Sequence, residues 1–302
     1  MRWLAIVVLL AAASAFADDA PPLTSLTDDP VFGKSPLRVE GEEIHGVVAF
    51  TFDDGPNPET TPAVIDALEK YDIPATFFIV TQRLSGEKSR DVLARELADG
   101  FTVGSHSVTH KNLKNATGDT ITNEIDASFR TLAKWANRTI GLFRPPYGAL
   151  SGAGRQRLRQ LGVTEVIWSI DTLDWKAHDA AKLRAKVGKM ILAQNGGIVL
   201  MHDVKPITAK IIADVFDDLE AENCRRLDAK QEPIWPVSLH YFIKNDKKTP
   251  RPVPDEVQKR TAAYKAALPG RCAKRTKTAA AESKPAPGDD PGLTNPFAPA
   301  AR

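Results

Sequence analysis

Short runs of consecutive apolar residues alternate along the chain with longer segments in which apolar residues recur every three or four positions. Runs of the first kind predict buried strands, and the second pattern predicts helices with one apolar face. The expected strands lie at residues 47–50, 75–80, 101–103, 141–143, 163–170, 198–201 and 237–242. The expected helices lie at residues 60–68, 89–98, 119–132, 152–161, 179–193 and 207–227. This alternation indicates an α/β fold of parallel strands with right-handed helical crossovers, in a barrel or a wound sheet.

Polar residues follow the carboxyl ends of most of the expected strands. They are Asp53, Asp54, His106, Arg144, Asp171 and His202. In a closed barrel of alternating strands and helices, these strand ends share one face, and catalytic residues collect there. The sequence therefore predicts one polar site at that face.

Two adjacent carboxylates, Asp53 and Asp54, end the first strand and precede a Gly-Pro turn. Neighbouring side chains on a strand point to opposite faces, but a turn at the strand end lets both acids converge on one cleft. Two carboxylates in one cleft have environments that push their pKa values apart, and a bound cation changes the balance further. The pair suits one metal ligand and one general base; the alternative is a polar turn after a strand.

Two histidines, His106 and His110, are spaced four residues apart in the segment HSVTH. On a helical turn this spacing places both imidazoles on one face, where they can bind one metal ion. Asp54 is a candidate third ligand. Two imidazoles and one carboxylate leave coordination positions open, as a catalytic zinc site requires.

Three further polar positions have candidate chemical roles. Arg144 is followed by two prolines that stiffen its turn, and it is a natural partner for the carboxylate of Asp53. Asp171 and His202 could pair, which would raise the pKa of the imidazole and suit a general acid. Trp175 offers a flat apolar surface for a sugar ring. The alternatives are a surface arginine, a structural histidine in the core and a tryptophan that packs the barrel.

The composition and the amino-terminal residues indicate the compartment. The chain has 302 residues and a formal net charge of +2, so no general affinity for nucleic acid or membranes is implied. Residues 1–17 have a basic start, a short apolar run and an Ala-x-Ala site, which predict a secretory signal peptide. The alternative is a membrane anchor. We expect an exported protein, periplasmic or secreted, without stable membrane insertion after the signal is removed.

The segments outside the alternating region are expected to differ from it. Residues 18–43 predict a leader over the domain surface, and residues 246–302 predict a basic and then Ala/Pro-rich tail that is partly disordered. The only two cysteines, Cys224 and Cys272, are expected to form a disulfide in an exported chain. Two unrelated thiols are the alternative.

The segments TFDDGP, HSVTH, RPPYG, DTLDW and LMH occur in this order between residues 45 and 243. Together they resemble the motifs of the polysaccharide deacetylases of the NodB-homology type, the fourth carbohydrate esterase family. The resemblance implies a distorted (β/α)7-like barrel of mostly parallel strands, with a single domain at residues 44–245. It also implies metal-dependent hydrolysis of acetamido groups on an N-acetylated glycan. The alternatives are an O-acetyl esterase on a polysaccharide such as xylan and an inactive glycan-binding protein.

The resemblance also implies residue roles. Asp53 is similar to the family's general base, with Arg144 as its partner, and His202 is similar to the general acid, with Asp171 tuning it. Asp54, His106 and His110 would bind a divalent metal, most readily zinc. The backbone N–H of Tyr147 would stabilise the oxyanion. Trp175 and Leu200 would wall the substrate groove and the acetyl pocket.

Overall fold

The computed structural model describes residues 38–41, 44–138, 140–243 and 255–282. The predicted signal peptide, most of the predicted leader and both ends of the predicted tail (residues 246–254 and 283–302) lie outside these residues. Within the described part of the chain, no helix has a stretch long and apolar enough to cross a membrane.

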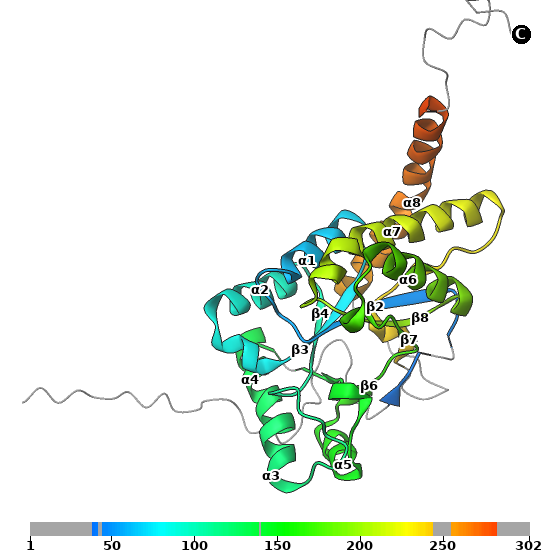
Figure 1. Ribbon diagram of the computed structural model, residues 1–302. Helices are drawn as coiled ribbons and strands as arrows, with labels where there is room; N and C mark the ends of the chain where they lie inside the picture. The colour runs from blue at the N-terminus through cyan, green and yellow to red at the C-terminus, as the bar shows by residue number, and fades with distance from the viewer. Residues whose placement is uncertain (1–37, 42–43, 139, 244–254, 283–302) are drawn as a thin grey trace, which may run out of the picture.

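One sheet of parallel strands forms the centre of the molecule (Figure 1). Its strands are β1 (Arg38–Val39), β2 (Val47–Asp53), β3 (Ala75–Ile79), β4 (Thr102–Ser105), β5 (Leu142–Phe143), β6 (Thr164–Val166), β7 (Ile170–Asp171), β8 (Gly196–His202) and β9 (Trp235–Pro236). The strand order is β1-β6-β5-β4-β3-β2-β8-β7, and β9 pairs with β2. Every pairing is parallel, so the predicted α/β class with parallel strands is confirmed.

The strand predicted at residues 163–170 is split into β6 and β7, which pair at opposite ends of the strand order. The N–H of Ile167 donates to the carbonyl of Val39 over 2.8 Å, and the N–H of Ser169 donates to the carbonyl of Ile198 over 3.1 Å. One bent segment therefore joins both ends of the sheet. The result is a distorted barrel, as predicted.

Helices surround the strands (Figure 1). They are α1 (Thr61–Lys70), α2 (Glu87–Ala98), α3 (Gly118–Ile121), α4 (Ala127–Ala136), α5 (Gly152–Leu161), α6 (Ala180–Gln194), α7 (Pro206–Asp228) and α8 (Asp255–Glu282). A π-helical segment, η2 (Thr122–Asp126), joins α3 to α4. Short 3-10 turns are η1 (Thr81–Ser85), η3 (Pro146–Gly148), η4 (Asp174–Lys176) and η5 (Leu239–Phe242). The apolar faces of the helices pack on the strands, as the helical periodicity predicts.

The strand predicted at residues 237–242 is wrong. The pairing of β9 with β2 ends at Val237, whose N–H donates to the carbonyl of Val48 over 2.9 Å. The chain then turns into η5, whose Leu239 and Phe242 are buried in a second apolar cluster. A short apolar run can pack as a turn as well as a strand, so its composition did not distinguish the two.

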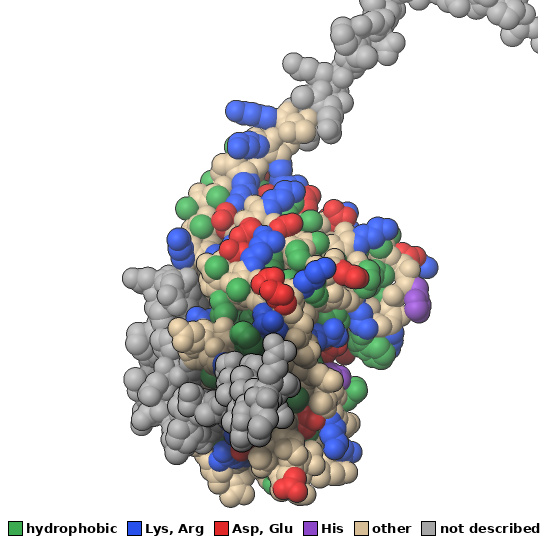
Figure 2. Space-filling model, turned by 90° about the vertical axis from the view of Figure 1, so that its left-hand side faces the viewer, with side chains coloured by type: hydrophobic (Ala, Val, Ile, Leu, Met, Phe, Trp, Pro, Cys, Tyr) green, Lys and Arg blue, Asp and Glu red, His purple; other side chains and the backbone are tan. Residues whose placement is uncertain are grey.

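Helix α8 lies beyond the boundary predicted at residue 245, in the segment predicted as a tail, and it packs on the domain. Tyr264 and Leu268 of α8 are buried in the main core, and the Tyr264 hydroxyl lies 3.0 Å from Asn223 Nδ2. The predicted disulfide between Cys224 and Cys272 is confirmed and joins α7 to α8. Lys and Arg side chains line the projecting end of this helix (Figure 2).

α8 lies at the amino ends of the parallel strands. Arg260 Nη2 donates to the carbonyl of Asp99, just before β4, over 2.6 Å. Arg271 Nη1 donates to the carbonyl of Tyr71, just before β3, over 3.0 Å. The helix is therefore on the face opposite the carboxyl ends of the strands, where the polar site was predicted.

Candidate active site and metal centre

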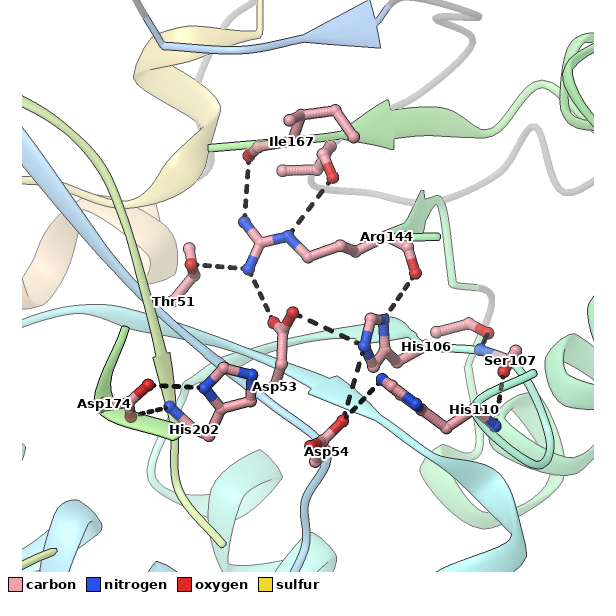
Figure 3. A network of polar contacts seen from close by, with 12 residues as sticks. Thr51, Asp53, Asp54, His106, Ser107, His110, Arg144, Ile167, Asp174 and His202 are labelled. Carbon is pink, nitrogen blue, oxygen red and sulfur yellow. Dashed lines mark hydrogen bonds and ion pairs between the residues drawn. The ribbon is translucent and has the colours of Figure 1, made fainter. Parts of the chain in front are cut away.

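A fully buried ion pair lies at the carboxyl end of β2. Arg144 Nη1 donates to Asp53 Oδ1 over 2.7 Å and to Thr51 Oγ1 over 2.8 Å (Figure 3). Its other nitrogens donate to the carbonyls of Val166 over 3.3 Å and Ile167 over 3.1 Å. The guanidinium is thus fixed by four acceptors, and it orients the Asp53 carboxylate, as predicted.

Burial and charge act in opposite directions on the pKa of Asp53. Burial raises the pKa of Asp53, while the charge and hydrogen bond of Arg144 lower it, and burial prevails. A raised pKa makes a carboxylate a better proton acceptor near neutral pH. Asp53 Oδ2 also lies 3.6 Å from His106 Nε2, so its free oxygen faces the adjacent histidines.

Asp54, His106 and His110 meet beside Asp53 (Figure 3). Asp54 Oδ1 lies 3.6 Å from His106 Nε2 and 3.3 Å from His110 Nε2. All three candidate ligand atoms lie within 4.8 Å of one another. The structure therefore brings together the three residues that the sequence predicted.

The predicted helical turn at residues 106–110 is wrong. The segment is a loop in which Ser107 has a φ of 68° and His110 a φ of 62°, both in the left-handed region. The N–H of His110 donates to Ser107 Oγ over 3.0 Å. The spacing of four residues still brings the rings together, with centroids 5.0 Å apart, but through a tight loop.

The three residues fit a divalent metal. Zinc ligands about 2.1 Å from a tetrahedral ion lie about 3.4 Å from one another, close to the spacings of the Asp54 oxygen from the two imidazoles. Asp54 Oδ1 is buried and has no hydrogen-bond partner among the described residues, although buried polar atoms normally have one. His106 Nδ1 donates to the carbonyl of Arg144 over 2.6 Å, and burial lowers its pKa to about 3. Its Nε2 lone pair is therefore available to a metal.

Glu124 holds the histidine loop and was missed in the sequence. Its Oε2 accepts the N–H of Val108 over 3.1 Å and the N–H of Thr109 over 2.9 Å. Its Oε1 accepts the Thr109 hydroxyl over 2.6 Å. Glu124 is buried and lies in the π-helical segment η2, and such segments often occur at functional sites. No local sequence signal marks it, because the contact depends on the tertiary fold.

His202 pairs with Asp174 rather than with Asp171, which corrects the prediction. Asp174 Oδ1 lies 2.7 Å from His202 Nδ1, and Asp174 Oδ2 accepts the His202 N–H over 2.7 Å (Figure 3). Thr208 also donates to Asp174 Oδ2, over 2.5 Å. Asp171 Oδ1 instead accepts the N–H of Leu173 over 2.9 Å, in a local turn.

The environment of His202 favours its protonated form. Burial alone would lower the pKa of His202, but the hydrogen bond and charge of Asp174, with the charges of Asp53 and Asp54, raise it to about 9. Because Asp174 accepts the Nδ1 proton, Nε2 carries the second proton. The imidazolium can donate that proton as a general acid.

The remaining predicted residues lie around this centre. Tyr147 is 65% exposed, with a φ of 59°, and its ring centroid lies 4.7 Å from that of His110. Trp175 is 51% exposed and follows Asp174 directly. Leu200 is buried on β8, two residues before His202 and therefore on the same face of the sheet.

A family model and several known proteins match this chain. The polysaccharide deacetylase family model matches residues 40–166, which include Asp53, Asp54, His106, His110 and Arg144. A peptidoglycan-N-acetylglucosamine deacetylase of Bacillus cereus is 30% identical over 184 residues, which cover 59% of this chain and 84% of that protein.

A longer relative matches only in part. The peptidoglycan-N-acetylglucosamine deacetylase PgdA of Listeria monocytogenes is 31% identical over 201 residues, which cover 66% of this chain but only 42% of that protein. The solved structure of the Bc1960 peptidoglycan N-acetylglucosamine deacetylase superposes with a TM-score of 0.58 at 26% identity. That match covers 72% of this chain and 96% of the other. The chain belongs to the polysaccharide deacetylase family.

Proposed function

We propose that the protein is a metal-dependent deacetylase that hydrolyses acetamido groups of an N-acetylated glycan and releases acetate. The observation that supports this most is the convergence of three groups at one strand edge: the Asp53–Arg144 pair, the Asp54–His106–His110 set and the His202–Asp174 pair. Together they comprise a buried base, a metal-ligand set with open positions and a protonated acid. Several relatives are named for deacetylation of peptidoglycan or chitooligosaccharides.

Asp54, His106 and His110 would hold the metal, and zinc suits two imidazoles and one carboxylate. When bound, the ion would polarise the acetyl carbonyl as a Lewis acid. Glu124 would keep the histidine loop in the geometry that this requires, through its bonds to Val108 and Thr109.

Asp53 would take a proton from the attacking water. Arg144 fixes its carboxylate, so the free Oδ2 faces the space beside His106 where the water would be bound. The water oxygen then forms a bond to the acetyl carbon. The N–H of Tyr147 would donate to the carbonyl oxygen as it gains negative charge.

His202 would complete the reaction by giving its Nε2 proton to the sugar nitrogen. The carbon–nitrogen bond then breaks, and acetate and a free amine leave. An amine is expelled from the tetrahedral species far more readily once it is protonated, whereas an alcohol depends less on such help. A His202 that is protonated at neutral pH therefore suits an amide substrate, whose amine must gain a proton to leave. Trp175 and Leu200 would wall the sugar groove and the acetyl pocket.

We also infer that the protein is exported. Residues 1–17 have the layout of a signal peptide, and the Cys224–Cys272 disulfide suits an oxidising compartment. Sequencing the amino terminus of the mature protein tests this. The expected result is a chain that begins at Asp18, and an intact Met1 on protein from the cell envelope would contradict it.

The experiment that tests the function is a panel of substrates scored for acetate. Peptidoglycan strands, chitin oligomers, an acetylated exopolysaccharide and acetylated xylan are compared at equal acetyl concentration. We expect acetate from an N-acetylated glycan, loss of activity on chelation and recovery with zinc. Acetate from xylan alone would point to an esterase, and no acetate from any glycan would reject the proposed function.

A further inference from the structure

Asp203 is a fully buried acid that the chemistry above does not use. It follows His202 at the carboxyl end of β8, where the register partner of His202 on β2 is Asp53. The Thr61 hydroxyl on α1 donates to Asp203 Oδ2, whereas Oδ1 has no hydrogen-bond partner within the described part of the chain. Buried polar atoms normally have such partners, so hydrogen bonding alone does not account for the burial of this side chain.

The Asp203 carboxyl lies directly against the turn at residues 54–57, here called the ligand turn because it carries Asp54. A Cβ atom added at Gly55 would lie 2.7 Å from Asp203 Oδ1 and closer still to Oδ2. The carboxyl therefore fills the space that a side chain at Gly55 would take. Asp54 has a φ of 75°, in the left-handed region that a non-glycine residue keeps only where its surroundings hold it. The packing of Asp203 on the next residue supplies one such restraint.

A second contact ties Asp203 to the other end of the ligand turn. Thr61, which donates to Asp203, also accepts the N–H of Asn57 at its Oγ1 over 2.8 Å. The carbonyl of Asn57 in turn accepts the N–H of Thr61 over 2.9 Å. Asp203 therefore restrains the turn at Gly55 by packing and at Asn57 through the hydroxyl of Thr61.

The ligand turn is also connected to the histidine loop. The carbonyl of Gly55 accepts the N–H of Val80, at the end of β3, over 3.1 Å. The next residue, Thr81, donates its N–H to the carbonyl of Ser107 over 3.1 Å. Ser107 Oγ accepts the N–H of His110. A displaced turn would therefore disturb this histidine as well as the carboxylate ligand.

We propose that Asp203 is a positioning residue that holds the ligand turn against the start of α1 and so fixes the metal ligands relative to His202. Its shape and its bond to Thr61 carry this role, and its charge does not. The kinetic part of the inference rests on the proposed function. The binding part needs only the metal site, and it can be measured without substrate.

The test uses two substitutions at the contact, with zinc affinity measured by competition with a chelator. Gly55→Ala should weaken zinc binding by about tenfold because its methyl group collides with the Asp203 carboxyl. Asp203→Ala should weaken it by a similar factor because the turn loses its support. In the double variant the methyl group occupies the vacated space, so zinc should bind more tightly than to Gly55→Ala alone. Losses that simply add would overturn the inference.

Conservative variants separate shape from charge. Asp203→Asn keeps the shape and an oxygen that can accept the Thr61 hydroxyl, so zinc affinity should stay near that of the wild type. Thr61→Ser keeps the hydroxyl and should also bind zinc normally, whereas Thr61→Val should bind it more weakly. A loss in Asp203→Asn as large as that in Asp203→Ala would assign the effect to charge and overturn the inference.

Kinetics and a control variant distinguish positioning from a general loss of stability. At saturating zinc, Asp203→Ala should lower kcat and leave KM nearly unchanged, because the displaced groups are the metal ligands and not the sugar groove. Asn223, buried on α7, donates to the carbonyl of Ile234 over 2.8 Å, so Asn223→Ala should lower stability without changing zinc affinity. Equal loss of zinc in Asn223→Ala would reject the positioning role. The expected order of zinc affinities in proteins that release no acetate would keep that role and reject the proposed chemistry.

Discussion

Replacing Asp174 by asparagine should lower the pKa of His202 and move the alkaline limit of activity. Asp174 is fully buried, and its Oδ1 lies 2.7 Å from His202 Nδ1. An asparagine side-chain oxygen can still accept the Nδ1 proton, so Asp174→Asn removes the charge and leaves the hydrogen bond possible. The variant therefore isolates the electrostatic contribution.

The size of the effect follows from the environment of His202. Burial lowers the pKa of His202, and Asp174 is the leading cause of its rise from 6.5 to about 9. Without that charge, burial opposes only the remaining hydrogen bond and the charges of Asp53 and Asp54, so the pKa should fall from about 9 toward 6.5. The difference corresponds to roughly 3 kcal/mol in favour of the imidazolium, at about 1.4 kcal/mol per pKa unit.

The assay is acetate release from an N-acetylated oligosaccharide between pH 5 and 10. The alkaline limb of kcat/KM reports the acid of the free enzyme, so it should lie near pH 9 in the wild type and move toward pH 6.5 in Asp174→Asn. At pH 8 this alone lowers activity by up to about 30-fold, the limit reached if the whole rise in pKa is lost. Asp171→Asn is the matched control and should leave the limb in place. A limb that moves in Asp171→Asn but not in Asp174→Asn would refute the assignment of Asp174.

The same pair makes stability depend on pH. Because the pKa of His202 is raised on folding, its stabilising contribution is fully present below pH 6.5 and is lost as pH rises through about 9. Denaturant unfolding should show the largest difference between wild type and Asp174→Asn at pH 6. That difference should shrink by up to roughly 3 kcal/mol at pH 10. A pH-independent difference would contradict the linkage.

Three further outcomes are expected. His110→Ala should lower metal content sharply while the fold measured by circular dichroism remains, and wild-type metal content in this variant would refute its role as a ligand. Glu124→Gln should weaken metal affinity by about tenfold or more, measured in competition with a chelator, because the Gln amide can present only one acceptor oxygen to the histidine loop. Unchanged affinity would refute the positioning role of Glu124. Replacing Cys224 and Cys272 by alanine, which opens a connection of 48 residues, should lower the free energy of unfolding by up to about 4 kcal/mol, and two free thiols in unreduced wild-type protein would contradict the disulfide.

The strand ends and their polar residues could be predicted because both depend on local patterns. The buried runs before Asp53 and before His202 are long and strongly apolar, and parallel strands place their ends at one edge. The partner of each polar side chain was harder to predict, because it depends on the tertiary fold. Asp171 ends its strand as the rule requires, but η4 folds back so that Asp174, three residues later, faces His202. The motif DTLDW contains both acids, and only the turn geometry decides between them.

The helix α8 could not be recognised because its core face is sparse. Thr261, Tyr264, Leu268 and Cys272 recur every three or four residues, but alanine, lysine and arginine fill most of the positions between them. A stripe this narrow resembles a solvated basic segment. Its docking depends on partners elsewhere, such as Asn223 near Tyr264, which composition does not reveal.

The central claim is that Asp53 is the base and Asp54 is a metal ligand. The most direct test compares Asp53→Asn with Asp54→Asn and measures acetate release and bound metal on the same samples. Asp53→Asn should keep its metal, since Asp54, His106 and His110 are intact, and should lose activity on the order of 10²–10⁴-fold without rescue by excess metal. Asp54→Asn should lose metal first and regain part of its activity when metal is added. If Asp53→Asn loses metal while Asp54→Asn keeps it, the two roles are exchanged, and full activity in both variants would place the chemistry elsewhere.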